Sequence, residues 1–279
     1  MKRMIAFLLG IGLGATVQAN SLATTCNMVG FVNVPTGGTN QYTCVGMNFQ
    51  SIGGRFGSLS DLLGSQLRKS DQLDKSSKVM LWDADAQQFV AYGLKKDGQF
   101  YAVNEWLTAR PYRKPLRPGS VMLVQGGVER LTICGEACQA DAVTNSLAGG
   151  PARPLNLICY PYPVPVDVQR FISIADGAQA SDVMAQADRL TLWDATKRSF
   201  VTLGLKADGK WHPLNNWAAN KPYTGVIKPG EGAYFQSSRP IIWVVRRPYD
   251  SMTATPAPAQ VQPAAIFDEG SGLLNAPIR

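Results

Sequence analysis

The stretch that decides the fold is residues 81–98, LWDADAQQFVAYGLKKDG, because it recurs as residues 192–209, LWDATKRSFVTLGLKADG. The offset of 111 residues holds beyond this stretch, since residues 79–125 and 190–236 share 18 identities in 47 gap-free positions. Self-similarity at a fixed offset is the signature of a repeated structural unit. The sequence therefore predicts two homologous modules, about 26–139 and 145–248, with a linker over 140–153.

Each module is expected to consist mainly of short antiparallel strands. Residues 88–94 and 100–103 flank an Asp-Gly pair at 97–98, and the second copy repeats this arrangement around 208–209. Asp-Gly between two alternating runs is a strong hairpin signal, because glycine tolerates the positive φ that tight turns require.

One short helix is expected in each module. Residues 58–63 begin with a capping Ser58 and continue with apolar residues at helical spacing, and residues 168–174 show the same spacing. The predicted fold class is mainly β: two homologous tandem antiparallel β-sandwich or barrel-like modules, each with a short helix. The sequence leaves sandwich and barrel open.

The two ends of the chain differ in character from the modules. Residues 1–19 have a basic start, a short apolar run and small residues before Ala19, which is typical of a cleavable signal peptide. We therefore expect an exported bacterial protein of the periplasm, the outer surface or the extracellular space. Residues 249–279 contain alternating Pro and Ala at 256–259, which predicts a flexible tail, with a docking peptide near its end as the alternative.

The charge balance argues against nucleic acid as a partner. The chain has 27 basic and 20 acidic residues, and removal of Lys2 and Arg3 with the signal leaves 25 basic residues. These are spread along the chain, whereas nucleic-acid binders concentrate them on one face. Weak attraction to an acidic polysaccharide is compatible with this mild positive charge.

Five cysteines follow the signal, and an exported protein is expected to form disulfides. The odd number leaves at least one thiol free or paired with another chain. A local bridge from Cys134 to Cys138 and a bridge from Cys44 to Cys134 are both open. The spacing aligns Cys44 with Cys159, which is the expected odd thiol. The disulfide candidates are Cys26, Cys44, Cys134, Cys138 and Cys159.

Catalytic signals are weak. Because His212 is the single histidine of the chain, a metal site built from several histidines is excluded. We expect His212 to be an ordinary strand residue. Asp83 and Asp194 recur in both copies, but each directly follows a strand, where Asp usually caps a turn. We therefore expect neither an enzyme nor a protein that needs a metal or cofactor.

Aromatic residues are the best-specified repeated feature. Trp82 and Trp193 are expected in the cores of the two modules. Trp106 and Trp217 lie beside polar residues and turns, where an exposed indole could stack on a sugar ring while neighbouring amides bind its hydroxyls. The candidate ligand-binding residues are Trp106, Trp217, Asn104, Asn215, Tyr112 and Tyr223.

The order Leu-Trp-Asp, aromatic strand, Asp-Gly, Trp and then PGEGAYF at 229–235 resembles modules that occur in tandem in uncharacterised secreted bacterial proteins. The resemblance covers about 80 residues per module. The first copy departs from it at Ser120 and Val121. The resemblance implies a secreted β-module and no assigned activity.

We expect a non-enzymatic structural or adaptor protein of the bacterial cell surface or periplasm. Its partners would be other cell-envelope proteins or further copies of itself. The alternative is a glycan-binding protein that uses the repeated Trp residues, and a secreted hydrolase is the weaker alternative. An assembly protein should expose apolar strand surface, a lectin a concave face with exposed Trp, and an enzyme one pocket that breaks the symmetry of the repeat.

Overall fold

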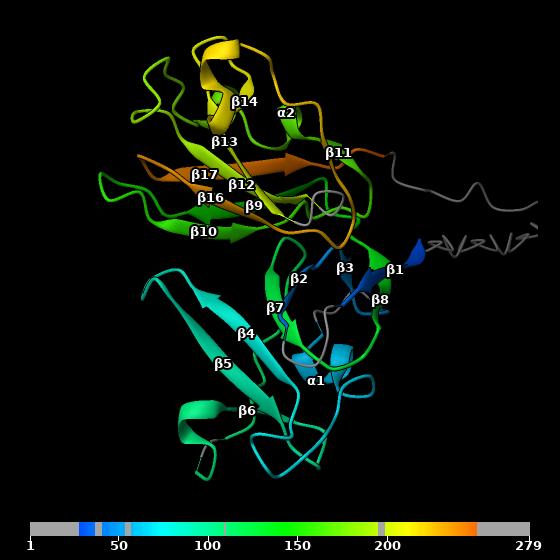
Figure 1. The fold of residues 1–279 in the computed structure, drawn as a ribbon. Helices are drawn as coiled ribbons and strands as arrows, with labels where there is room; N and C mark the ends of the chain where they lie inside the picture. Colours follow the sequence, from blue (N-terminus) through cyan, green and yellow to red (C-terminus); the bar gives the residue numbers. More distant parts are fainter. Residues whose placement is uncertain (1–27, 37–40, 54–56, 109, 195–198, 250–279) are drawn as a thin grey trace, which may run out of the picture. The chain divides into compact units, whose positions relative to one another are not determined.

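The computed structural model describes residues 28–36, 41–53, 57–108, 110–194 and 199–249. The predicted signal peptide, Cys26 and residues 250–279 of the predicted tail lie outside the described residues. Within these ranges, seventeen strands form antiparallel sheets. The helices between them are short (Figure 1). The predicted mainly-β class is therefore confirmed.

The first module contains a five-stranded sheet and a three-stranded sheet. The five-stranded sheet has the order β2-β7-β4-β5-β6. Its members are β2 (Thr43–Gly46), β4 (Lys78–Asp83), β5 (Gln88–Leu94), β6 (Phe100–Ala102) and β7 (Val121–Gln125). The three-stranded sheet has the order β1-β8-β3, with β1 (Val29–Pro35), β3 (Phe49–Gln50) and β8 (Arg130–Ala137).

The second module has a five-stranded sheet in the order β10-β16-β12-β13-β14. Its members are β10 (Leu155–Ile158), β12 (Arg189–Asp194), β13 (Ser199–Leu205), β14 (Trp211–Pro213) and β16 (Ala233–Gln236). Two strand pairs complete it: β9 (Ala142–Leu147) with β17 (Ile241–Arg246), and β11 (Val166–Asp167) with β15 (Val226–Ile227). The prediction of a linker over 140–153 is wrong where β9 forms, because this segment supplies the partner strand of β17.

The two five-stranded sheets have the same strand order, and β4, β5 and β6 match β12, β13 and β14 at the offset of 111 residues. The edge strands differ. Thr43 pairs with Val124, and Asn156 pairs with Phe235, so β2 corresponds to β10 at an offset of 113. Cys159 therefore corresponds to Gly46 and not to Cys44. An origin by duplication stays a prediction.

Local sequence explains the turns and the first helix. Gly98 and Gly209 have φ of 80° and 78°, as the predicted hairpins require. In α1 (Leu59–Leu63) the Ser58 side chain accepts from the backbone N–H of Asp61, and the Asp61 carboxylate accepts from the backbone N–H of Ser58. These reciprocal bonds form a capping box.

The other helical segments are also brief. They are α2 (Val168–Phe171), which is shorter than predicted, and the 3₁₀ turns η1 (Val103–Glu105), η2 (Ile174–Asp176) and η3 (Leu214–Ala219).

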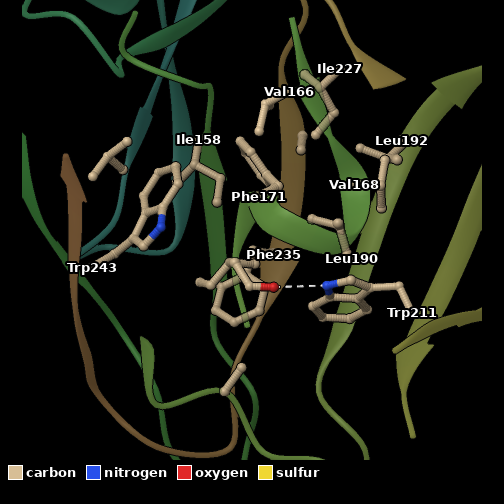
Figure 2. Close-up of a cluster of buried hydrophobic side chains, with 14 of the residues drawn as sticks. Ile158, Val166, Val168, Phe171, Leu190, Leu192, Trp211, Ile227, Phe235 and Trp243 are labelled. Carbon is tan, nitrogen blue, oxygen red and sulfur yellow. Dashed lines mark hydrogen bonds between the residues drawn. The ribbon is translucent and has the colours of Figure 1, made fainter. Parts of the chain in front are cut away.

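Each module has its own buried cluster. In the first, residues from both sheets and α1 pack together, among them Leu59, Phe100 and Leu131. In the second, Trp211 is fully buried and its indole N–H donates to the carbonyl of Ile172 at 2.8 Å (Figure 2). Two sheets that share a core, with open edges in the five-stranded sheet, favour the sandwich over the barrel in the first module.

Candidate interaction surface

The two modules contact each other through reciprocal backbone bonds. The N–H of Gly46 donates to the carbonyl of Gly230 at 2.8 Å, and the N–H of Cys159 donates to that of Gly119 at 3.2 Å. Gly46 corresponds to Cys159, and Gly119 corresponds to Gly230. The contact is therefore made by equivalent groups in both directions, as at a two-fold interface.

Asn48 strengthens this contact from a fully buried position. Its amide nitrogen donates to the carbonyl of Tyr160, and its amide oxygen accepts from the N–H of Gly230. A buried amide with both ends bonded fixes the register of the surfaces that it joins.

The hairpin of β4 and β5 makes a further contact with the second module. The indole N–H of Trp82 donates to the carbonyl of Leu155 at 2.9 Å. The Gln87 side chain accepts from the N–H of Leu155 at 2.7 Å and donates to the same carbonyl at 3.2 Å. One side of β10 pairs with β16. On the other side, the Gln87 side chain bonds to the Leu155 peptide group as the backbone of a neighbouring strand would. The prediction that Trp82 is a core residue is wrong.

The equivalent aromatic pair of the second module is exposed. The rings of Trp193 and Phe200 lie 5.1 Å apart, edge to face, and Phe200 lies 6.0 Å from Tyr234. Trp193 is 48% exposed and Phe200 56%. Trp193 was also expected in the core, and it is not there. Its strand alternates, so Leu190 and Leu192 take the core face while Trp193 points to the other face.

Two more strands expose apolar side chains. On β1, Val29 and Phe31 are exposed, and on β17, Ile242 and Val244 are exposed between the buried Ile241, Trp243 and Val245. Rows of apolar residues on the outer face of a strand are typical of interaction surfaces.

The two Trp residues predicted to bind sugar also make contacts within the protein. Trp106 donates its indole N–H to the carbonyl of Asp71, and Trp217 donates to that of Asp182, each at 3.0 Å. Both rings are only partly exposed. A Cβ on Gly93 would lie 2.6 Å from the Trp106 ring, and one on Gly204 would lie 2.7 Å from the Trp217 ring. Each ring is therefore seated on a glycine of its own sheet.

A lysine also covers each of these rings. Lys95 Nζ lies 4.9 Å from the Trp106 ring centre, and Lys206 Nζ lies 5.0 Å from that of Trp217. Lys206 is almost fully buried and donates to Asn220 and to the carbonyl of Trp217. Such cation–π contacts occupy a face that a sugar would need.

The remaining predicted ligand residues have different surroundings from the indoles. Asn104 and Asn215 are exposed, whereas Tyr112 and Tyr223 pack against the cores of their modules. The Tyr112 ring lies 4.6 Å from that of Tyr92. The amides therefore face solvent, and the tyrosines serve the cores.

His212 is a buried strand residue beside a carboxylate. Its Nε2 lies 3.0 Å from Asp208, and its Nδ1 is buried without a hydrogen-bond partner. Burial opposes ionisation of Asp208, but bonds from the Lys210 backbone N–H and from His212 outweigh it and lower the Asp208 pKa. In the first module Tyr101 takes this place and donates to Asp97 at 2.6 Å. Each hairpin is therefore held by a contact between its turn Asp and a strand side chain, which is Tyr101 in the first module and His212 in the second.

The four described cysteines are free thiols: Cys44, Cys134, Cys138 and Cys159. The local bridge from Cys134 to Cys138 is wrong for a physical reason. Cys134 lies in the extended β8, which ends at Ala137, and four residues of strand span about 13 Å, against a Cα separation below about 7 Å in a disulfide. Burial raises the pKa of the Cys44 thiol to about 12 and raises that of Cys159 as well, so both are poor nucleophiles.

A pocket of about 260 Å³ lies beside α2 and β17, lined partly by Arg170, Asp176 and Arg246. Asp176 is its one carboxylate and already accepts from the N–H and hydroxyl of Ser173. Sugar hydrolysis needs two carboxyl groups, so this lining does not suit it.

Among the described residues, no three His, Cys, Asp or Glu side chains gather as a metal site. None of the described helices is long and apolar enough to span a membrane.

Comparison of the chain with protein-family models, curated proteins and solved structures finds no match.

Proposed function

We propose that this chain is an exported, non-enzymatic structural or adaptor protein of the bacterial cell envelope, and that it acts by assembling through its modules. The observation that carries this is the exposed apolar surface on three strands or hairpins. Phe31 on β1 is 67% exposed and Ile242 on β17 is 68% exposed, and the Trp193–Phe200 pair adds an aromatic patch. Monomeric proteins rarely expose such groups in rows, because their burial against a partner is favourable.

The glycan-binding alternative has weaker support. It requires free indole faces at Trp106 and Trp217, whereas both indoles bond to backbone carbonyls and lie against lysine and glycine. Trp193 and Phe200 are the better exposed rings, but the first module holds the equivalent pair against protein.

The experiment is a measurement of molar mass in solution by light scattering, at several concentrations. We compare the full chain, a chain that ends at residue 250, and the full chain with Phe31→Ser. Leu107→Ser is the matched control, because Leu107 is 91% exposed but lies outside the apolar strands.

If the chain that ends at residue 250 still assembles, the contacts lie in the modules, as proposed. If this shorter chain no longer assembles, the contacts lie in the tail. We expect Phe31→Ser to weaken assembly and Leu107→Ser to leave it unchanged. A single-chain mass for the full chain at every concentration contradicts the proposal.

A further inference from the structure

The strand β1 has an open edge. In the sheet order β1-β8-β3, β8 pairs with one side of β1, and no described residue pairs with the other side. The N–H of Ala137 donates to the carbonyl of Met28 at 2.8 Å. At the other end of the pair, the N–H of Thr36 donates to the carbonyl of Glu129 at 3.0 Å. Because bonded and non-bonded positions alternate along an antiparallel ladder, the even-numbered residues of β1 bond to β8, and the odd-numbered residues direct their N–H and carbonyl groups to the open edge.

The side chains at these odd-numbered positions are exposed as well. Val29 is 58% exposed and Phe31 is 67% exposed, and Asn33 is also exposed. The strand, VGFVNVP, contains no charged residue. Soluble proteins usually protect an edge strand against pairing with a charged side chain, a proline or a bulge. In β1 this protection is limited to Pro35, the last residue of the strand.

The equivalent strand of the second module has the same backbone arrangement without the apolar side chains. In the pair of β9 and β17, the N–H of Arg247 donates to the carbonyl of Asp141 at 2.8 Å, so the even-numbered residues of β9 point away from β17. At the offset of 113 residues that relates β2 to β10, Phe31 corresponds to Thr144. The outward positions of β9, all exposed, are Ala142, Thr144 and Ser146.

We propose that β1 pairs with β1 of a second copy of this chain, antiparallel and about a two-fold axis at Phe31. Phe31 of each copy then stands opposite Phe31 of the other, and Val29 stands opposite Asn33. Each of these residue pairs exchanges both of its hydrogen bonds, and two aromatic rings meet across the strands. This inference rests on the proposed assembly function and names one of its contacts.

A second copy of β1 fits this edge because the edge is complementary to itself. A shift of two residues in one direction brings Pro35, which has no N–H, into the ladder. A shift in the other direction runs past Val29, where β1 begins. Because β1 carries no charge, two copies approach each other without the repulsion that like charges on facing strands would cause.

The tail is a poorer match for this edge. Residues 250–279 contain proline at 256, 258, 263 and 277 and glycine at 270 and 272, and two adjacent pairs, 266–267 and 273–274, supply most of their large apolar residues. A strand that covers β1 must supply N–H groups and alternating side chains along its seven residues. The tail sequence contains no such run.

The test is a disulfide between two different positions of β1, because it reports the register of the pairing. Val29→Cys and Asn33→Cys are made separately in the full chain. Both carry Cys26→Ser and Cys134→Ser, since Cys134 is exposed on β8 opposite Phe31. The two variants are mixed, oxidised and separated without reduction. Phe31 is kept, and the molar mass of the wild type is measured by light scattering at the same concentrations.

The matched control is a mixture of Ala142→Cys and Ser146→Cys in the same background, at the equivalent positions of β9. Opposite residues in a bonded antiparallel pair have Cα atoms about 5.5 Å apart, which a disulfide can span. Two copies of the same β1 variant would hold their thiols about 13 Å apart, which is too far.

We expect a disulfide-linked dimer in the mixture of the two β1 variants, and none from either variant alone or from the β9 mixture. No dimer in the β1 mixture while the wild type assembles overturns this pairing and leaves the proposed function standing. Crosslinking of either β1 variant with itself, or equal crosslinking in the β9 mixture, overturns it in the same way. A single-chain mass for the wild type at every concentration refutes assembly itself, and with it the proposed function.

Discussion

Gly46→Ala should weaken the contact between the two modules. An added Cβ would lie 2.7 Å from the backbone oxygen of Glu231 and 2.8 Å from Cys159 Cβ. Both neighbours are backbone or directly attached to it, so they must move by several tenths of an ångström. That movement also stretches the bond from Gly46 N–H to the carbonyl of Gly230.

The expected loss of unfolding free energy is about 2–3 kcal/mol, since overpacking costs about 1–3 kcal/mol and a backbone hydrogen bond about 1 kcal/mol. The assay is urea unfolding followed by tryptophan fluorescence. Gly126→Ala is the matched control, because its added Cβ would meet the flexible end of Leu67 at 2.7 Å. We expect the control to lose less than about 1 kcal/mol.

A double variant sharpens this test. Cys159→Gly removes the Cβ that the new methyl group would meet, so Gly46→Ala should cost less in that background than in the wild type. Equal stability of Gly46→Ala and the wild type, or strict additivity in the double variant, would refute the packing that we describe between the modules.

Three further predictions concern single residues. Cys134 is exposed and Cys159 is buried with a raised thiol pKa, so iodoacetamide should modify Cys134 in the folded protein and Cys159 only after unfolding, as read by peptide mass spectrometry. Bonds from the Ser58 backbone and hydroxyl lower the Asp61 pKa, so Asp61→Asn should reduce the unfolding free energy at pH 7, and this difference should vanish as the pH falls below about 4. Trp211→Phe removes the donor to a buried carbonyl and should cost about 1–3 kcal/mol in urea unfolding.

A specific result would contradict each of these three predictions. Equal labelling of both cysteines in the folded protein would show that Cys159 is accessible. An Asp61→Asn effect that stays constant down to pH 2 would exclude the carboxylate as its source. Trp193→Phe is the control for Trp211→Phe, because Trp193 is half exposed, and an equal loss in both would contradict the specific role of the buried indole.

The turns and the helix cap were predictable because their causes are local. A positive φ at Gly98 and the cap at Ser58 each involve groups only a few residues apart. The strand β9 was missed because its small and polar residues resemble a linker, and its pairing partner β17 lies about 100 residues later. Strand pairing at that distance leaves no local sequence signal.

The surface was harder to predict than the fold for the same reason. Trp82 and Trp106 are both repeated tryptophans with polar neighbours, and the sequence does not show which groups of the protein their indoles contact. The structure places Trp82 against Leu155 and bonds Trp106 to a carbonyl 35 residues away. Both contacts depend on long-range packing. The exposure of Trp193 follows from the two-residue alternation of its strand, which could have been applied from the sequence.

Assembly through the modules is tested by the molar mass of the full chain in solution, compared with that of Trp193→Ala at the same concentrations. Because Trp193 is half exposed and outside both cores, this variant should fold like the wild type. We predict a mass that is a multiple of the single-chain mass for the wild type, and a shift toward the single-chain mass for the variant. A single-chain mass for both proteins at the highest concentration would contradict it.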